Sequence, residues 1–197
     1  MKSGKKDGGV KEQLESYISK QKGKWIVLLE IPEEKYFEIN VNTLKTLIGR
    51  GFSGLHISLN RPYQNLIELL KEQHIDVGKL SFIDGASSQA DLKEKETEKC
   101  IYISKELKID ELIRAIYKSI PKIKNKNKFL FMDSITTLAL YQPLSETLRF
   151  AEFLKRVLQN DEIEGVVVNV AKDLAQKSFI KDIILKVDKV IEIDGGK

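Results

Sequence analysis

The stretch Lys128-Phe129-Leu130-Phe131-Met132-Asp133-Ser134 places four apolar residues in a row directly before a carboxylate and a hydroxyl. A strand that is buried on both faces of a parallel sheet shows such an unbroken apolar run instead of alternation. In open α/β sheets, ligands bind outside the carboxyl ends of the strands. The stretch therefore predicts a central strand that carries Asp133 and Ser134 to the edge of the sheet where a ligand would bind.

Length and composition predict a single α/β domain. The chain has 197 residues, of which 42% are hydrophobic and 31% are charged, enough for one full core and too few for two domains. The single Cys100 excludes a disulfide within the chain and a multi-cysteine metal site. No apolar run approaches the roughly 18 residues of a membrane span, and the N-terminus lacks the apolar centre of a signal peptide. We expect a soluble, cytoplasmic protein without membrane contact.

The net charge of +4 belongs entirely to the N-terminal part of the sequence. Residues 1–24 hold seven lysines and three acidic residues, whereas residues 25–197 carry no formal net charge. We expect residues 1–24 to be a basic, flexible leader with a short amphipathic helix at 10–21, and residues 25–197 to be the folded domain. A neutral body argues against nucleic-acid binding beyond weak contacts of the leader.

Segments with strand character alternate with segments of helical periodicity along the whole chain. This order predicts a three-layer αβα domain with a mostly parallel, twisted sheet. The segment 85–99 loses its apolar periodicity, which predicts an exposed loop. The strands are expected at 25–31, 54–59, 80–84, 100–103, 128–134, 166–170 and 187–193. The helices are expected at 40–50, with Asn40 or Asn42 as the N-cap, from Pro62 onward, at 107–120, 135–140, 144–158 and, weakly, 173–186.

Several short segments, in this order and spacing, resemble the RecA-like superfamily and most closely its archaeal and bacterial KaiC-type domains. They are Gly54–Leu59, Leu80–Asp84, Phe131–Leu138 with the pattern of a Walker B strand, Arg149-Phe150, and Val187–Ile191. The likeness spans about residues 25–193. It implies the αβα fold, ATP and magnesium as ligands of active members, and side-by-side assembly of domains.

The sequence departs from that family where the phosphate-binding loop would lie. The family has a loop of the form G-x-x-x-x-G-K-[ST], whose glycines let backbone N–H groups approach phosphate. This chain has Glu30-Ile31-Pro32-Glu33-Glu34-Lys35-Tyr36-Phe37, which contains no glycine. Proline has no N–H, and two carboxylates would repel phosphates, so Lys35 is the only remnant. Lys45-Thr46 imitates the end of the motif but lies inside a predicted helix.

A second departure concerns the general base. The KaiC-type pattern places paired glutamates just after the second strand, and this chain has Asn60-Arg61 there. Neither side chain can take a proton from water at neutral pH. Asp133 could hold a cation, although magnesium bound by one or two carboxylates normally needs substrate phosphates. The alternative is that Asp133 caps the following turn while Ser134 bonds locally.

Other chemistry-bearing residues predict no catalytic or metal site. His56, His74 and Cys100 lack partners at ligand spacing. The cluster Asn60, Arg61 and Tyr63 could be an interaction surface, because arginine and tyrosine are enriched at binding hot spots. The alternative is that Arg61 pairs with Asp84 or Asp133 and that Tyr63 packs on the edge of the sheet.

Two hypotheses about function follow. The first is a non-catalytic RecA/KaiC-like domain, a pseudo-ATPase without cofactor or metal, that binds another protein, an active relative or a second copy of itself. The second is an atypical nucleotide-binding ATPase or sensor, accessory to DNA repair or signalling. In that case Lys35, Arg61, Asp84, Asp133 and Ser134 would hold ATP and magnesium.

Overall fold

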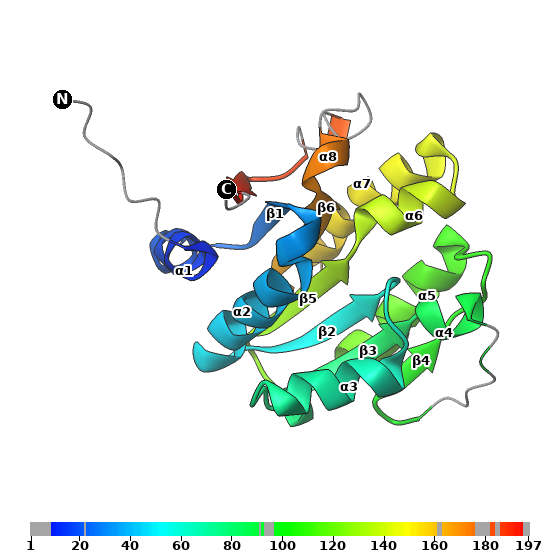
Figure 1. The fold of residues 1–197 in the computed structure, drawn as a ribbon, viewed down its shortest axis with the longest axis horizontal. Coiled ribbons are helices and arrows are strands. Elements are labelled where there is room, and N and C mark those ends of the chain that lie inside the picture. Colours follow the sequence, from blue (N-terminus) through cyan, green and yellow to red (C-terminus); the bar gives the residue numbers. More distant parts are fainter. Residues whose placement is uncertain are drawn as a thin grey trace.

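The computed structural model describes residues 9–21, 23–90, 92, 97–160, 163–175, 182–183 and 186–194, and within them it forms one seven-stranded parallel sheet (Figure 1). The strand order is β4-β3-β2-β5-β6-β1-β7, which places β5 in the centre. The α/β fold with a parallel sheet is as predicted. The strands are β1 (Trp25–Ile31), β2 (Ser53–Ser58), β3 (Leu80–Asp84), β4 (Cys100–Tyr102), β5 (Lys128–Asp133), β6 (Ile163–Ala171) and β7 (Lys189–Glu192).

Helices cover both faces of the sheet (Figure 1). One face is covered by α1 (Val10–Lys20), α2 (Tyr36–Gly49) and α3 (Tyr63–Glu72), and the other by α5 (Ile109–Ser119), α6 (Ile135–Tyr141) and α7 (Leu144–Asn160). Two short helices, α4 (Ala86–Gln89) and α8 (Lys172–Ala175), follow strands β3 and β6, and 3-10 turns lie at Glu33–Lys35, Val77–Lys79 and Ile120–Lys122. The three-layer αβα prediction is confirmed.

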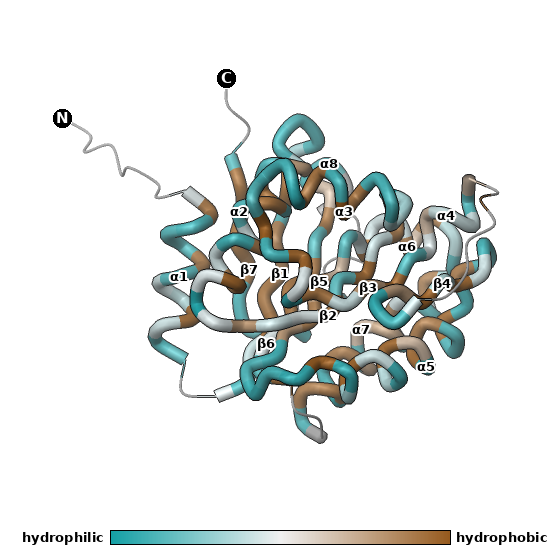
Figure 2. Tube along the Cα trace, turned by 90° about the horizontal axis from the view of Figure 1, so that it is seen from below, coloured by the Kyte–Doolittle hydropathy of each residue, from teal (hydrophilic) through white to brown (hydrophobic). Residues whose placement is uncertain are grey.

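The central strand supplies both hydrophobic cores. Phe129 and Phe131 belong to the core under α1, α2 and α3, whereas Leu130 and Met132 belong to the core under α5, α6 and α7. Successive side chains of a strand point to opposite faces, so an unbroken apolar run is what a two-sided strand requires. Figure 2 shows the hydrophobic residues concentrated along the strands and the hydrophilic ones on the outer sides of the helices.

Helix α1 packs on the body. Val10, Leu14 and Ile18 lie on one side of the helix and are buried in the same core as α2. The helical spacing of these three residues therefore predicted both the helix and its apolar face. Residues 1–8 of the expected leader lie outside the described residues.

The predicted start of α2 was wrong. The helix begins at Tyr36, after a 3-10 turn that follows Pro32, so Asn40 and Asn42 lie inside it and cap nothing. Asn40 is buried and bonds to another element, and this tertiary contact outweighs its local preference for a helix start. The predicted start of α3 was also wrong by one position, because Pro62 is the N-cap and Tyr63 is the first helical residue.

The predicted exposed loop at 85–99 is partly wrong. Ala86 and Ser87 begin helix α4 and are buried, because the carboxylate of Asp84 accepts hydrogen bonds from their backbone N–H groups. Residues 91 and 93–96 lie outside the described residues, as do most of those in the expected weak helix at 173–186.

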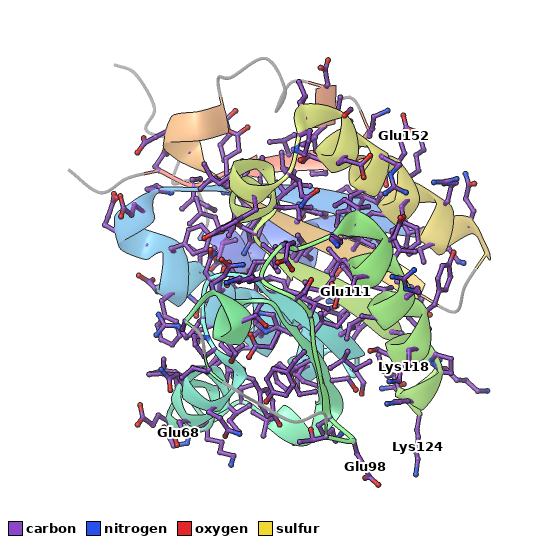
Figure 3. All side chains as sticks on the ribbon, turned by 90° about the vertical axis from the view of Figure 1, so that its right-hand side faces the viewer. Glu68, Glu98, Glu111, Lys118, Lys124 and Glu152 are labelled. Carbon is purple, nitrogen blue, oxygen red and sulfur yellow. The ribbon has the colours of Figure 1, made fainter. Side chains whose placement is uncertain are left out.

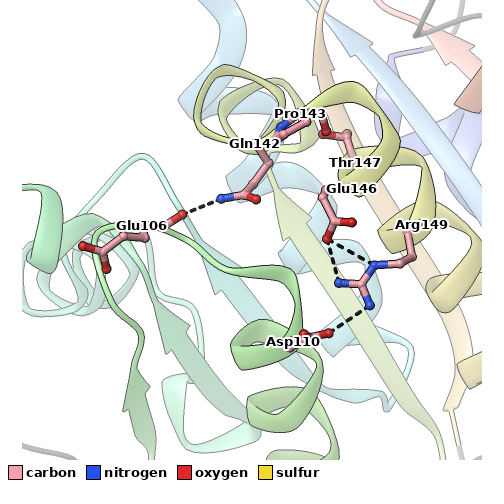
Figure 4. Close-up of polar contacts among 7 residues, drawn as sticks. All are labelled: Glu106, Asp110, Gln142, Pro143, Glu146, Thr147 and Arg149. Atoms are coloured by element: carbon pink, nitrogen blue, oxygen red, sulfur yellow. Dashed lines mark hydrogen bonds and ion pairs between the residues drawn. The ribbon is translucent and has the colours of Figure 1, made fainter.

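Polar contacts join α5 and the segment before it to α7 and the end of α6 (Figure 4). Arg149 pairs with Glu146 at 2.7 Å in its own helix and with Asp110 at 2.9 Å in α5. The side-chain amide of Gln142 donates to the carbonyl oxygen of Glu106 at 2.5 Å. Exposed ion pairs of this kind contribute little stability, so they orient α7 against α5 more than they stabilise the fold.

Candidate functional site

The carboxylate of Asp133 is the centre of the site. It ends β5 opposite Ser58 of β2 and is only 6% exposed. One of its oxygens accepts a hydrogen bond from the Asn40 side-chain amide at 3.0 Å, and the other accepts one from Asn60 at 2.9 Å. Helix α2 and the segment after β2 therefore each supply one donor to the end of the central strand.

A chain of hydrogen bonds fixes the orientation of both amides. Asn169 of β6 donates to the amide oxygen of Asn40 at 2.6 Å, and the Thr137 hydroxyl donates to the amide oxygen of Asn60. With the oxygens engaged in this way, each NH₂ group is left to face the carboxylate. The carboxylate is thus held by two neutral amide donors, which Asn169 of β6 and Thr137 of α6 orient.

Burial changes the protonation of this cluster. Removal from water raises the pKa of Asp133 from 3.8 to about 6, although hydrogen bonds from Asn60 and the charge of Arg61 act in the opposite direction. Burial also raises the pKa of the neighbouring Tyr36 phenol well above its usual value, with a further contribution from the charge of Asp133. Tyr36 therefore stays neutral, and Asp133 titrates close to neutral pH.

A cavity of about 240 Å³ opens beside Asp133 between α2, α3 and the end of β2. Its polar lining includes Glu33, Glu34, Tyr36, Asn40, His56, Asn60, Arg61 and Asp133, and its apolar lining Phe37, Val41, Leu44, Leu66 and Leu70. The guanidinium of Arg61 lies over the ring of Phe37, 5.4 Å from the centroid. The cavity thus joins acidic, basic and apolar groups in a space that would hold a small molecule or one side chain of a partner.

His56 is the most unusual residue of this lining. It is 1% exposed, and neither ring nitrogen has a hydrogen-bond partner among the described residues. Its ring lies against Phe131, edge to face, and against Phe82. Burial lowers the pKa of His56 to about 3, so the imidazole is neutral at physiological pH and has an unused donor and an unused acceptor.

The structure brings only some of the predicted site residues together. Asn60, Arg61 and Asp133 line the same cavity. Lys35 instead donates to the carbonyl oxygen of Asp194 at 2.6 Å, beyond the end of β7. The Ser134 hydroxyl accepts a hydrogen bond from the Thr137 N–H and is the N-cap of α6.

Asp84 organises the backbone on the other side of β2. Its carboxylate accepts hydrogen bonds from the N–H groups of Tyr63 at 2.7 Å, Ala86 at 2.8 Å and Ser87 at 2.9 Å, and from the Ser87 hydroxyl at 2.6 Å. It thereby anchors the beginnings of α3 and α4. Because four donors already occupy this carboxylate, it has little capacity left for a ligand.

The expected pairing of Arg61 with Asp84 or Asp133 is not formed as an ion pair within the described part of the chain. Arg61 acts on Asp133 only through its charge. The ring of Tyr63 packs at 5.0 Å from that of Phe82, on the edge of the sheet. Asn60 is left exposed and Arg61 half-buried at the mouth of the cavity.

Sequence reasoning missed four residues of the cluster: Tyr36, Asn40, His56 as a cavity residue, and Asn169. Two of them carried a signal. Asn169 interrupts the β-branched run of β6, and His56 interrupts the apolar run of β2. A polar residue inside a strand buried on both faces needs a partner or a function, and this rule would have selected both.

The fold defines the class: a three-layer α/β domain with a parallel sheet and a polar cluster at the carboxyl edge of the central strand. No family model matches the sequence, and no curated protein matches it. None of the described helices has the length and apolar character needed to cross a membrane. No group of three or more acidic, histidine or cysteine side chains in the described residues could bind a metal ion.

Three solved structures of archaeal proteins have a similar fold. An uncharacterized protein of Pyrococcus horikoshii, crystallised with an unknown peptide, has a TM-score of 0.68 at 16% identity, over 92% of this chain and 82% of that chain. A KaiC-like protein of Pyrococcus horikoshii has a TM-score of 0.59 at 18% identity, over 89% and 75%. The flagellar accessory protein FlaH of Methanocaldococcus jannaschii has a TM-score of 0.58 at 12% identity, over 96% and 81%. The chain has the KaiC/RecA-like fold.

The raised pKa of Asp133 predicts a pH dependence of stability that Asp133→Asn removes. Between pH 3.8 and about 6 the folded state binds the proton more tightly than the unfolded state, so stability falls as pH rises through this window. We expect the free energy of unfolding of the wild type, relative to Asp133→Asn, to fall by at most about 3 kcal/mol over this range. Urea unfolding of both proteins at pH 4, 5, 6 and 7 measures this difference. If the unfolding free energies of the wild type and of Asp133→Asn change in parallel with pH, the raised pKa of Asp133 is contradicted.

His56→Phe should stabilise the protein by about 1–3 kcal/mol at pH 7, because it removes two buried, unpaired nitrogens from an aromatic environment.

The pH dependence of stability that His56 causes has the opposite sign to that of Asp133. The lowered pKa means that the unfolded state binds the proton more tightly between about 3 and 6.5, so the wild type loses stability as pH falls. The same unfolding series should show a smaller acid loss for His56→Phe. If His56→Phe is less stable than the wild type at pH 7, the prediction is wrong and the imidazole contributes more through its packing than its unpaired nitrogens cost.

Proposed function

We propose that this protein is a non-catalytic domain of KaiC/RecA-like fold that acts as an interaction or regulatory module by binding a segment of another protein. The observation that carries the proposal is the turn between β1 and α2. Residues Pro32 to Lys35 form a single 3-10 turn without a glycine, and the carboxylates of Glu33 and Glu34 line the cavity beside Asp133.

The backbone of this turn offers little to a phosphate group. The N–H of Lys35 donates to the carbonyl oxygen of Pro32 at 3.1 Å, and the N–H of Tyr36 donates to that of Glu33. A phosphate-binding loop needs such N–H groups free and directed at the ligand. The two carboxylates add repulsion, and the Lys35 amine is directed to Asp194.

The chemistry at the end of β2 and β5 also favours a binding role. Asn60 and Arg61 occupy the place where a general base would stand, and neither can accept a proton from water near pH 7. Both oxygens of Asp133 already accept amide hydrogen bonds, which offset part of the cost of burying the carboxylate. These features do not fit a magnesium nucleotide, and we derive no reaction from the site.

An exposed apolar surface lies next to the polar cluster. Leu140, Tyr141 and Leu144 are 75%, 48% and 47% exposed, and we call them the α6–α7 patch. Thr137, one turn before Leu140 and Tyr141 in α6, bonds to Asn60, so the patch adjoins the polar mouth of the cavity. Apolar side chains beside an arginine are typical of a protein-binding surface. The similar Pyrococcus protein was crystallised with an unknown peptide, which is consistent with such a role.

The second candidate is an atypical nucleotide sensor. It is favoured by the cavity itself, where Arg61 and Asp133 stand beside the first turn of α2. The first candidate is preferred because the groups nearest to an incoming phosphate would be Glu33 and Glu34.

A thermal unfolding panel with ATP, ADP and GTP, each with and without magnesium, tests the nucleotide question. We expect no stabilisation, whereas a true ligand at 100 times its dissociation constant adds about 2.7 kcal/mol. Stabilisation by ATP that needs magnesium, and that Arg61→Ala and Asp133→Ala both abolish, would establish the second candidate instead.

Peptide binding tests the interaction role directly. Peptides selected from a random library on the immobilised full chain should lose at least about tenfold in affinity in the double variant Leu140→Ser/Tyr141→Ser, which corresponds to about 1.4 kcal/mol. The control Leu92→Ser/Tyr117→Ser changes two other exposed apolar residues and should bind normally. The proposal fails if no peptide is selected, or if both double variants weaken binding equally. Sedimentation of the same variants shows whether a second copy of the chain is the partner.

A further inference from the structure

The opposite edge of the sheet carries a second feature, which is independent of the proposed function. In a parallel sheet all amino ends lie at one edge, so the segments that enter β1, β2, β3, β5 and β6 meet there. Two grooves of about 600 and 630 Å³ run along this edge and share the residues 123–125 between them. Because they share these residues, we treat the two grooves together and call them the amino-edge groove.

Lysines dominate the amino-edge groove. Its walls include six exposed lysines and two glutamates, namely Lys24, Lys79, Lys99, Lys122, Lys124, Lys126, Glu98 and Glu164. Figure 3 shows Lys124 and Glu98 projecting outward at the same end of the molecule. Because residues 25–197 carry no net charge, a basic groove leaves the rest of the domain with an excess of acid. The neutral total therefore conceals an uneven charge distribution.

Several of these lysines lack a partner of opposite charge. Lys79, Lys122, Lys124 and Lys126 form no ion pair or hydrogen bond with a described residue, and Lys99 donates only to the carbonyl oxygen of Gly78 at 2.9 Å. Ammonium groups gathered in one groove repel one another, and this repulsion is relieved when an anion binds. The groove is thus suited to a ligand with several negative charges.

The segment that carries three of the lysines is held firmly in place. The side-chain amide of Asn125 donates to the carbonyl oxygen of Gly51 at 2.7 Å and to the Ser53 hydroxyl at 3.2 Å. The N–H of Ser53 in turn donates to the carbonyl oxygen of Asn127 at 3.0 Å, and Ile123 is buried. Alternate residues thus anchor the segment while Lys122, Lys124 and Lys126 face solvent. The charges are presented in a fixed row, so binding costs little backbone entropy.

The lining also indicates how the anion would be recognised. It contains no aromatic side chain in either groove, so it has nothing on which an unpaired base could stack. Lysine binds phosphate as a point charge and carries no base information. We propose that the amino-edge groove binds the phosphate backbone of double-stranded nucleic acid, without sequence specificity.

Fluorescence anisotropy with a labelled mixed-sequence DNA duplex of about 20 base pairs tests this proposal on the full chain. If four to six lysines neutralise phosphates, affinity should fall about 10²–10³-fold between 50 and 200 mM salt, following a slope of about −0.9 per contact. The triple variant Lys122→Glu/Lys124→Glu/Lys126→Glu should abolish binding at 50 mM salt. All three positions are exposed, so the variant should keep the wild-type melting temperature.

A matched control separates the groove from net charge. The variant Lys45→Glu/Lys71→Glu/Lys105→Glu makes the same charge change at exposed positions outside the groove and should lose at most about tenfold in affinity. Removal of residues 1–8, which contain three lysines, should leave binding largely unchanged. The proposal is overturned if the two triple variants behave alike, if the truncation alone abolishes binding, or if polyglutamate binds at 50 mM salt while the duplex does not.

Discussion

A carboxylate buried at the end of the central strand is the constraint on which this structure depends. Asp133 sits where β5 leaves the sheet, and a charge in that position is costly unless hydrogen-bond donors surround it. The donors come from α2 and from the segment after β2, so both must be placed within hydrogen-bond distance of one carboxyl group. This requirement explains why Asn40 lies inside a helix and why that helix passes over the end of β5.

The choice of donor determines what the cluster can do. Amides stabilise a carboxylate without cancelling its charge, and here their orientation is fixed by hydrogen bonds from Asn169 and Thr137. His56 lies in the same cavity, and its ring nitrogens have no partner among the described residues. Burial lowers the pKa of His56 and raises the pKa of Asp133, so in both residues it favours the uncharged form. A domain selected only for stability would have replaced the imidazole by an apolar ring. Its presence in a buried, aromatic environment is therefore a cost in stability that the fold alone does not explain.

The sequence was sufficient for most of the fold and for little of the site. Strands buried on both faces, such as β5, have a pattern that comes directly from local geometry, and the alternation with helices left few arrangements other than a parallel sheet. The site depends on contacts between residues far apart in sequence. Asn40 and Asp133 are separated by 93 positions, and nothing in the local pattern around Asn40 distinguishes a buried donor from a helix cap. Asp84 shows the same difficulty, because its position at a strand end suggested a ligand site while its four bonds organise the backbone.

Charge is the property for which a count along the chain was least informative. A body with equal numbers of acidic and basic residues argues against a nucleic-acid ligand only if the two kinds are mixed on the surface. Parallel topology allows an uneven distribution, because every segment that enters a strand lies at one edge and every segment that leaves lies at the other. Lys79, Lys99 and the lysines of 122–126 all precede strands, and Glu33 and Glu34 follow one. The parallel connectivity brings the lysines of the entering segments together at the amino edge, and electrostatic attraction depends on this local field rather than on the sum.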